Sequence, residues 1–248
     1  SVPESAPRAC SQGARLLALA RSSLFGSLDH AQLHRVDAHA SMRPMEADEA
    51  IHLAGQPAER LHVIATGTVK LTGTTGEGTE VLLDVVGPGA FVGTLPNLGG
   101  RSYSDSAWAL TAGCLLSFDA PGLEAVLREF PGVMRHALAA VGERLQLAQQ
   151  RIQRAATSSA RVRIAGTLLT LAERLGVDAD ERVLIDVPLA RDDLASLAGC
   201  APETVSRTLA AWRRDGVIDA GRRWVAIRDP AALAEVAGVT TSLRVPAG

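Results

Sequence analysis

Residues 40–120 alternate apolar and polar positions in short stretches, such as LHVIATGTVKLTG and TEVLLDVVG. A period of two places successive side chains on opposite faces of a strand. Glycines separate these stretches, and glycine adopts the backbone conformations that tight turns require. Many short strands joined by glycine-containing turns predict a compact antiparallel β-roll or barrel.

Helical spacing flanks this region on both sides. Residues 14–35 carry it with a break at Gly26–Ser27, and a second, longer helix is expected from Pro131, a favoured first residue. Along this helix a narrow apolar seam follows a heptad pattern on an otherwise polar surface. Such a seam favours pairing with a partner helix in a twofold dimer, whereas packing against its own domain is the alternative. The seam consists of Leu138, Val141, Leu145, Ala148, Ile152 and Ala155.

The C-terminal third mixes short helices and strands. Residues 161–175 predict an amphipathic helix that ends at Gly176, and the serines within 157–159 predict a hinge before it. A short strand within 181–189 and two short helices within 191–215 follow. Residues 216–229 alternate as a β-hairpin does, with Ala220–Gly221 in its turn.

Composition narrows the class of protein. The 248 residues are 47% hydrophobic and 21% charged, which is typical of a folded globular chain. No apolar run reaches the length of a membrane span, and no targeting segment is evident, so a cytoplasmic protein is expected. The three cysteines, Cys10, Cys114 and Cys200, are far apart in the sequence. Their spacing argues against a disulfide framework and against a metal site.

The segment LARDDLASLAGCAPETVSRTLAAWRRDGVI carries the strongest signal. Gly199 separates two short helices, and Pro202 begins the second. In the second helix Val205, Leu209 and Trp212 are predicted to pack inward. Glu203, Ser206 and Arg207 share another face near its N-terminus. This arrangement is typical of a helix-turn-helix whose second helix enters the major groove of DNA.

Each of these polar side chains suits base readout. The Arg207 fork fits guanine O6 and N7, Glu203 can accept from cytosine N4, and Ser206 can contact a base or a phosphate. Contacts with the DNA backbone are expected from Thr204, Arg213, Arg214, Arg222 and Arg223. The alternative is an ordinary surface helix, which the neighbouring turn and hairpin make less attractive. The overall charge of −2 gives no sign of nucleic-acid binding by itself.

With these motifs the chain resembles the Crp/Fnr superfamily of bacterial transcription regulators over about residues 20–228. The resemblance rests on LAGQPAERLHVIATGTVKL, on GPGAFVG, on the seam helix and on RDDLASLAGCAPETVSR. It implies a homodimer on double-stranded DNA, with RNA polymerase as a further partner if the protein activates transcription. The E-x-x-S-R arrangement is similar to the fumarate-nitrate branch, which implies palindromic sites with TTGA-like half-sites.

The expected fold is therefore α+β, with an N-terminal antiparallel β-roll (a double-stranded β-helix), a long dimerisation helix and a C-terminal winged helix-turn-helix. Residues 21–120 would form the cyclic-nucleotide-binding-like β-roll, the sensor domain. The other expected parts are a flexible lead at 1–20, a dimerisation region at 121–157, the DNA-binding domain at 158–230 and a tail at 231–248.

The expected effector pocket departs from the cyclic-nucleotide pattern of the family. That pattern implies a Gly-Glu pair for the ribose and an Arg-Ser pair for the phosphate, whereas this chain has Gly93–Thr94 and Asp105–Ser106. A carboxylate repels a phosphate. The position that contacts the base falls near Gln149, and Arg101 is a possible substitute for the missing arginine through a rearranged loop. Ordinary cyclic AMP is therefore not the expected signal.

Other signals remain open. The single N-terminal cysteine, Cys10, argues against an iron–sulfur cluster, while haem or another small-molecule effector stays a candidate. His30 and His34 have a spacing that can present two ligands, although solvated surface histidines have the same spacing. Cys200, in the predicted turn beside the DNA, is a redox candidate, with burial as a small side chain as the alternative.

We expect a regulator and not an enzyme. The rival readings are a cyclic-nucleotide-responsive regulator with a rearranged phosphate loop, a cupin-like metal enzyme, and a scaffold protein whose helix-turn-helix has lost DNA contact. A cupin would need clustered histidine and carboxylate ligands on adjacent strands, and the sequence shows no such cluster.

Overall fold

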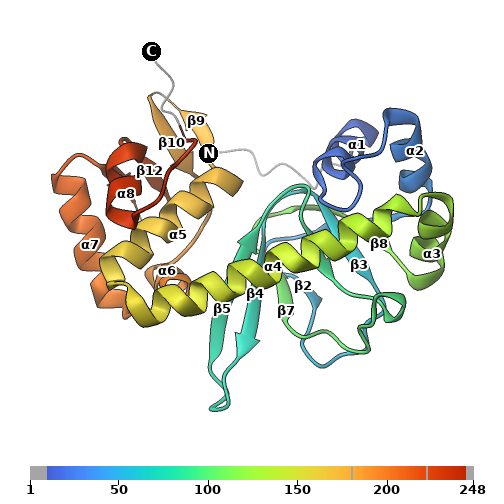
Figure 1. Cartoon of the computed structure of the whole chain (residues 1–248), viewed down its shortest axis with the longest axis horizontal. Helices are drawn as coiled ribbons and strands as arrows, with labels where there is room; N and C mark the ends of the chain where they lie inside the picture. Colours follow the sequence, from blue (N-terminus) through green and yellow to red (C-terminus); the bar gives the residue numbers. More distant parts are fainter. Residues whose placement is uncertain (1–9, 180, 222, 244–248) are drawn as a thin grey trace. The chain divides into compact units, whose positions relative to one another are not determined.

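The computed structural model describes residues 10–179, 181–221 and 223–243 (Figure 1). The chain divides into two compact units. The first runs to Glu80 and from Val85 to Gln146, and the second holds Val81–Asp84 and runs from Leu147 onward. The division falls inside one continuous helix, α4 (Gly132–Thr157), and not at the expected boundaries after residues 120 and 157.

The first unit contains the expected antiparallel β-roll. Two four-stranded sheets have the orders β1-β8-β3-β6 and β2-β7-β4-β5. Gly67, at the β3–β4 turn, has a φ of +85°, and a Cβ on Gly113 would lie 2.1 Å from the Thr66 carbonyl oxygen, so the expected turn glycines are required here. The strands are β1 (Ser41–Met45), β2 (Ala50–His52), β3 (Leu61–Thr66), β4 (Val69–Thr74), β5 (Glu80–Val86), β6 (Phe91–Gly93), β7 (Ser106–Ala109) and β8 (Gly113–Phe118).

Helices cover one sheet of the roll. Besides α4, they are α1 (Gln12–Arg21), α2 (His30–Ala38), the single 3₁₀ turn η1 (Pro96–Leu98) and α3 (Ala120–Glu129). Leu19 and Phe25 from the N-terminal region pack with Phe118 of β8 and Val126 of α3 in one apolar core. A smaller core, which includes Met45, Ile64 and Val69, contains side chains from both sheets.

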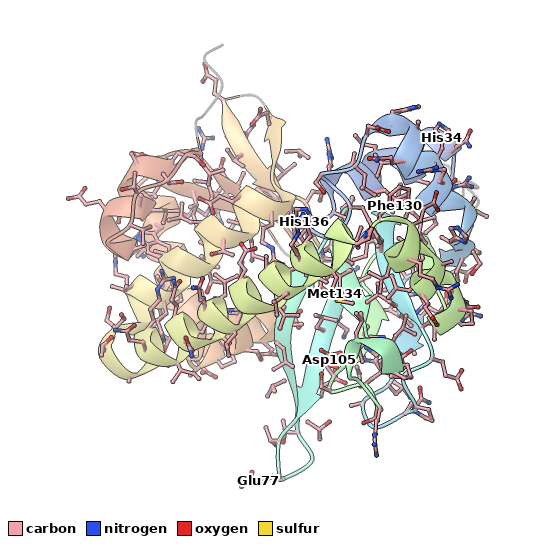
Figure 2. The ribbon with its side chains drawn as sticks, turned by 45° about the vertical axis from the view of Figure 1, so that its right-hand side comes forward. His34, Glu77, Asp105, Phe130, Met134 and His136 are labelled. Carbon is pink, nitrogen blue, oxygen red and sulfur yellow. A yellow bond between two sulfur atoms is a disulfide. The ribbon has the colours of Figure 1, made fainter. Side chains whose placement is uncertain are left out.

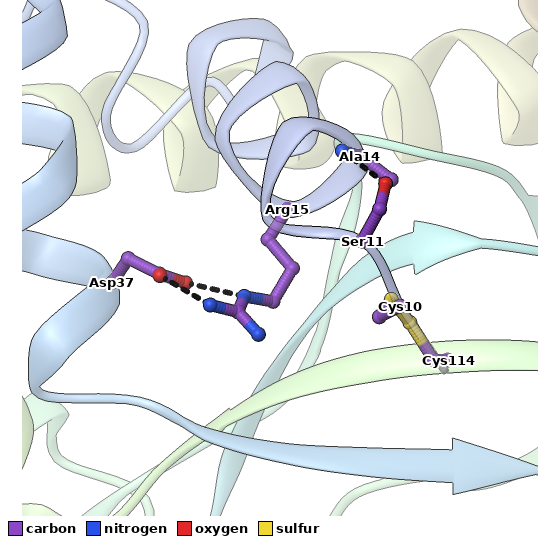
Figure 3. Close-up of a disulfide and its surroundings, with 6 residues drawn as sticks. All are labelled: Cys10, Ser11, Ala14, Arg15, Asp37 and Cys114. Carbon is purple, nitrogen blue, oxygen red and sulfur yellow. Dashed lines mark hydrogen bonds and ion pairs between the residues drawn. A yellow bond between two sulfur atoms is a disulfide. The ribbon is translucent and has the colours of Figure 1, made fainter.

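The structure corrects the expectation about cysteines. Cys10 and Cys114 form a disulfide although they are 104 residues apart, and their Cα atoms lie 6.2 Å from each other (Figure 3). Helix α1 begins just after Cys10 and packs on β3, which pairs with β8, so the two cysteines meet through the tertiary fold. Linear spacing alone could not reveal this pair.

The start of α1 is fixed by further polar contacts. Ser11 caps the helix by accepting from the Ala14 N–H, and Arg15 makes a two-pronged ion pair with Asp37 of α2 at 2.8–2.9 Å (Figure 3). The expected flexible lead at 1–20 is therefore wrong from residue 10 onward, because these residues are ordered against the roll. Residues 1–9 lie outside the described part of the chain.

The second unit is a winged helix-turn-helix with one additional helix. The region expected as a tail from residue 231 instead continues α8, which packs on α5, buries Leu233 and is capped by Asp229. Its antiparallel sheet has the order β11-β12-β10-β9. The elements are α5 (Ala160–Leu175), β9 (Val177–Ala179), β10 (Arg182–Ile185), α6 (Arg191–Ala198), α7 (Pro202–Arg214), β11 (Ile218–Ala220), β12 (Val225–Ile227) and α8 (Pro230–Ala237).

None of the described helices combines the length and the apolar character that crossing a membrane requires. In the described part of the chain, no three His, Cys, Asp or Glu side chains gather as a metal site would need.

A buried histidine makes the first unit sensitive to acid. His62 of β3 lies 2.6 Å, at Nδ1, from the Ser117 hydroxyl of β8. Burial, together with the smaller effect of the charges of Arg43, His52 and Arg60, lowers the pKa of His62 from 6.5 to about 3. Between these two pH values the unfolded chain binds a proton that the folded chain does not, so stability falls as the pH drops below 6.5.

We predict that unfolding free energy, measured by urea titration, decreases between pH 6.5 and pH 4 by up to roughly 1.4 kcal/mol per pH unit from this group. His62→Gln should remove this component of the slope, whereas His30→Gln, at an exposed position, should keep it. An unchanged slope in His62→Gln would show that other groups cause the acid sensitivity.

Candidate nucleic-acid interface

Helix α6 and the turn after it have the predicted geometry. Asp193 accepts from the Ala190 N–H at 2.7 Å and thereby caps α6, while Leu194 and Ala198 are buried. Gly199 ends the helix in a left-handed conformation with φ +60° and ψ +47°. The N–H of Cys200 then bonds back to the Ala195 carbonyl at 3.0 Å, which closes the turn before the second helix.

A single arginine fixes this turn from outside. Arg163 of α5 donates from Nε to the Ala198 carbonyl at 2.7 Å and from Nη2 to the Gly199 carbonyl at 2.8 Å. Its Nη1 donates to the carbonyl of Ser158, in the predicted hinge. Helix C-termini leave carbonyl groups without intrahelical partners, and a guanidinium can satisfy several of them at once. No local pattern in the sequence marks Arg163 for this role, because its partners lie up to 36 residues away.

Helix α7 presents a buried face and a polar face. Val205, Leu209 and Trp212 are at most 2% exposed, as predicted. On the opposite face Glu203, Ser206 and Arg207 are all exposed and lie together near the N-terminus, which begins with Pro202. No side chain in the described residues caps this end, so its backbone N–H groups can face a phosphate.

The residues predicted to contact the DNA backbone differ in exposure. Arg213, Arg214 and Arg223 are exposed, Thr204 is half-buried, and Arg222 lies outside the described residues. The wing itself is held internally. Asp219 of β11 accepts from Arg228 at 2.7 Å and from Arg182 at 3.1 Å, and the hydrogen bond from Arg228, followed by the charges of both arginines, lowers the pKa of Asp219. The side chain of Arg191 donates to the Gly221 carbonyl and fixes the wing to α6.

The predicted seam lies open on α4. Leu138, Val141, Leu145 and Ile152 are 73%, 58%, 59% and 72% exposed, and Ala148 and Ala155 are exposed as well. On the other side of this helix Val133 and Ala140 are buried. The helix thus uses a different stripe for its own core, so the alternative that the seam packs on its own domain does not describe this structure. Pairing with a second copy stays a prediction.

The predicted effector residues come together only in part. Gly93, Thr94 and Asp105 line a cavity of about 500 Å³ in the first unit. Ser106 uses its hydroxyl to accept from the Ala54 N–H at 3.0 Å. Arg101 and Gln149 are exposed and are not among the described residues that line this cavity.

The redox and histidine candidates are placed as follows. Cys200 is half-buried in the turn, and burial raises the pKa of its thiol, which disfavours the reactive thiolate. The rings of His30 and His34 of α2 meet edge to face with centroids 4.7 Å apart, and His30 is exposed while His34 is half-buried. A role for Cys200 in redox sensing stays a prediction with this pKa shift against it.

Comparison with known proteins agrees with the architecture. Residues 42–130 match the cyclic nucleotide-binding domain family, and residues 162–236 match the Crp-like helix-turn-helix domain family. The chain is 30% identical to the cyclic AMP receptor protein of Thermus thermophilus over 87% of its own length and 97% of that protein. It is 32% identical to the transcriptional regulator LdrP of the same organism over 79% of its own length and 97% of that protein.

Among solved structures, FixK2 of Bradyrhizobium japonicum has the same fold with a TM-score of 0.71, at 23% identity, over 82% of this chain and 99% of that one. A β-roll followed by a winged helix-turn-helix defines a class of two-part regulators. This chain belongs to the Crp/Fnr family of DNA-binding transcription regulators within that class.

We predict that Arg163→Ala lowers the unfolding free energy by about 1–3 kcal/mol, since three carbonyl groups lose a charged donor. Arg163→Lys should recover only part of this loss, because an ammonium group lacks the planar fork. Urea unfolding gives the free energies. Arg128→Ala, which breaks an exposed pair with Glu124 of α3, is the control and should change stability by less than about 0.5 kcal/mol. An equal effect of Arg163→Ala and Arg128→Ala would contradict the assignment.

Proposed function

We propose that this protein regulates transcription as a homodimer that reads an inverted repeat through helix α7. The observation that carries this proposal is the exposed face of Glu203, Ser206 and Arg207 at the N-terminal end of a helix whose other face is buried. Two copies related by a twofold axis would place these faces in successive major grooves about 34 Å apart. The seam on α4 is the surface that we assign to the twofold contact.

The polar face supports a TTGA-like half-site. Arg207 would make paired hydrogen bonds to a guanine, Glu203 would accept from a cytosine amine, and Ser206 would add a third contact. Thr204, Arg213, Arg214 and Arg223 would bind the phosphates that position the helix. If the bound protein activates transcription, RNA polymerase is a further partner.

The regulation would act through the hinge. A signal in the β-roll would change the populations of dimers whose reading helices have the correct or the wrong spacing. The hinge carbonyl of Ser158 is bonded to Arg163, so any displacement of the hinge would move the helix-turn-helix with it. This mechanism lets a distant effector act without touching DNA.

The signal that we propose is not ordinary cyclic AMP, although one relative is named as a cyclic AMP receptor. Asp105 lines the cavity of the roll, and none of the described residues that line it carries a positive charge. A cyclic phosphate would therefore meet a repulsive carboxylate and no cation to neutralise it. Arg101, the possible substitute, is exposed in this structure.

We predict that Arg207→Ala weakens binding to a TTGA-containing palindrome by about 1–3 kcal/mol and relaxes the preference at one guanine. Arg213→Ala, the matched arginine control, should weaken binding to all sequences alike and reduce the salt dependence. Fluorescence anisotropy with matched and substituted operators separates the two. The same loss on both operators for Arg207→Ala would remove it from base readout.

We also predict that Leu145→Glu produces a monomer by burying a charge in the seam, and that palindromic DNA binding is lost with it. Sedimentation equilibrium gives the oligomeric state. Gln149→Glu, a substitution on the same helix outside the seam, should leave the dimer intact. A Leu145→Glu protein that remains dimeric would place the interface elsewhere.

A further inference from the structure

The cavity in the first unit is mostly apolar and has one acid in its wall. Its apolar lining comes from the segment between α1 and α2, from strands β3, β4 and β6, from η1 and from helix α4. The polar groups in the described lining are Thr94, Tyr103, Ser104 and Asp105. A volume of about 500 Å³ is in the range that small-molecule sites occupy. Figure 2 labels Asp105 together with Met134 of α4, which also lines the cavity.

Asp105 is held in place by a buried histidine. Its Oδ1 lies 3.0 Å from His52 Nε2, and the side chains are 28% and 2% exposed. The His52 ring stacks on Tyr103 with centroids 4.1 Å apart, and the Tyr103 hydroxyl accepts from the N–H groups of Glu59 and Arg60. A carboxyl group supported in this way needs little reordering when it meets a ligand.

The second carboxyl oxygen is available for that contact. Among the described residues Asp105 Oδ2 has no partner, while Oδ1 is bonded to His52. Because the described lining carries no positive charge, the acid is the strongest electrostatic feature of the cavity. It favours a donor or a cation and disfavours an anion.

We propose that this cavity binds an apolar amine, with the protonated nitrogen at Asp105 Oδ2 and the apolar body against Leu71, Phe91 and Met134. The proposal rests on the proposed function, since it names the class of effector for the same regulator. In the cyclic-nucleotide pattern a positively charged side chain binds an anionic phosphate, whereas this site would bind a cation through Asp105. An ammonium group adjacent to a fixed carboxylate forms a charge-assisted hydrogen bond, and the surrounding apolar wall strengthens it.

The same cavity reaches the seam. Leu138 and Val141 line it and are also seam residues with large exposed areas. A ligand that packs against these two side chains would change the surface that meets the second copy. Binding and pairing of the subunits would therefore be coupled, and each would strengthen or weaken the other by the same factor.

The test uses three probes with one apolar body and different heads: 4-phenylbutylamine, 4-phenylbutanol and 4-phenylbutyrate. Isothermal titration calorimetry on the full chain, with cyclic AMP as a fourth titrant, measures affinity. We expect the amine to bind more tightly than the alcohol, the alcohol more tightly than the acid, and cyclic AMP not to bind. A negative heat-capacity change should accompany amine binding, because apolar surface is buried.

Variants locate the site. Asp105→Asn should weaken the amine at least about tenfold and remove its advantage over the alcohol, because the charged acceptor is lost. Glu77→Gln, which removes an acid between β4 and β5 (Figure 2), is the matched control and should bind as the parent does. Ala137→Phe, which fills the cavity without changing Asp105, should abolish binding of both the amine and the alcohol.

Each outcome decides the proposal. It is overturned if 4-phenylbutyrate or cyclic AMP binds more tightly than the amine, if the amine does not bind at millimolar concentration, or if Asp105→Asn binds it unchanged. Should Asp105→Asn fail to fold, retained amine binding in folded Ala137→Phe would overturn it instead. Operator binding is measured alongside, with and without the amine. Operator binding in either state together with failed amine binding rejects the effector class alone, whereas no operator binding in both states rejects the regulator itself.

Discussion

The turn of the helix-turn-helix is held in place by the guanidinium of Arg163. Two of its donors occupy the carbonyl groups at the end of α6, and a third holds Ser158, just before α5 begins. Gly199 alone would allow the chain to turn, because left-handed backbone is accessible to glycine, but it would not select one angle between the helices. The charged donor holds the end of α6 and the turn against the start of α5, and the burial of Trp212 and Leu209 leaves the polar face of α7 exposed.

In the β-roll, the residues that shape the backbone differ from the residues that line the cavity. Its turns depend on glycines such as Gly67 and on the close approach at Gly113, and neither position touches the cavity. The lining, in contrast, is set by a few side chains. His52 supports Asp105, while His62, on β3 of the other sheet, is kept neutral by burial beside Ser117. The same backbone can therefore carry an aspartate at a position where relatives that bind cyclic nucleotides are expected to carry an arginine.

The sequence predicted what is encoded over short distances. The helix-turn-helix could be found because Gly199, Pro202 and the three inward residues of α7 are spaced within one supersecondary unit. The seam was visible for the same reason, since a heptad repeat is a local pattern. Helix α8 carried readable signals too: Asp229, Pro230 and Gly238 mark its ends, and interpreting that region as a tail overlooked them.

What the sequence could not supply were contacts between distant residues. Cys10 and Cys114 meet because α1 packs on β3, and no spacing rule covers 104 residues. His52 reaches Asp105 across 53 positions, and Arg163 reaches Gly199 across 36. Each of these pairs forms only in the tertiary fold, so the residues around the cavity were less predictable than the two faces of α7.

The bonds of Arg163 all end on residues 158–199, and α8 closes the outer side of α5 within the same unit. The hydrogen bonds that hold the helix-turn-helix thus involve none of the residues that line the cavity of the roll. Under the proposed function, substitutions in that cavity would change the signal without altering the contacts that hold the helix-turn-helix. A regulator organised in this way would be able to acquire a new stimulus while it keeps its existing binding sites on the chromosome.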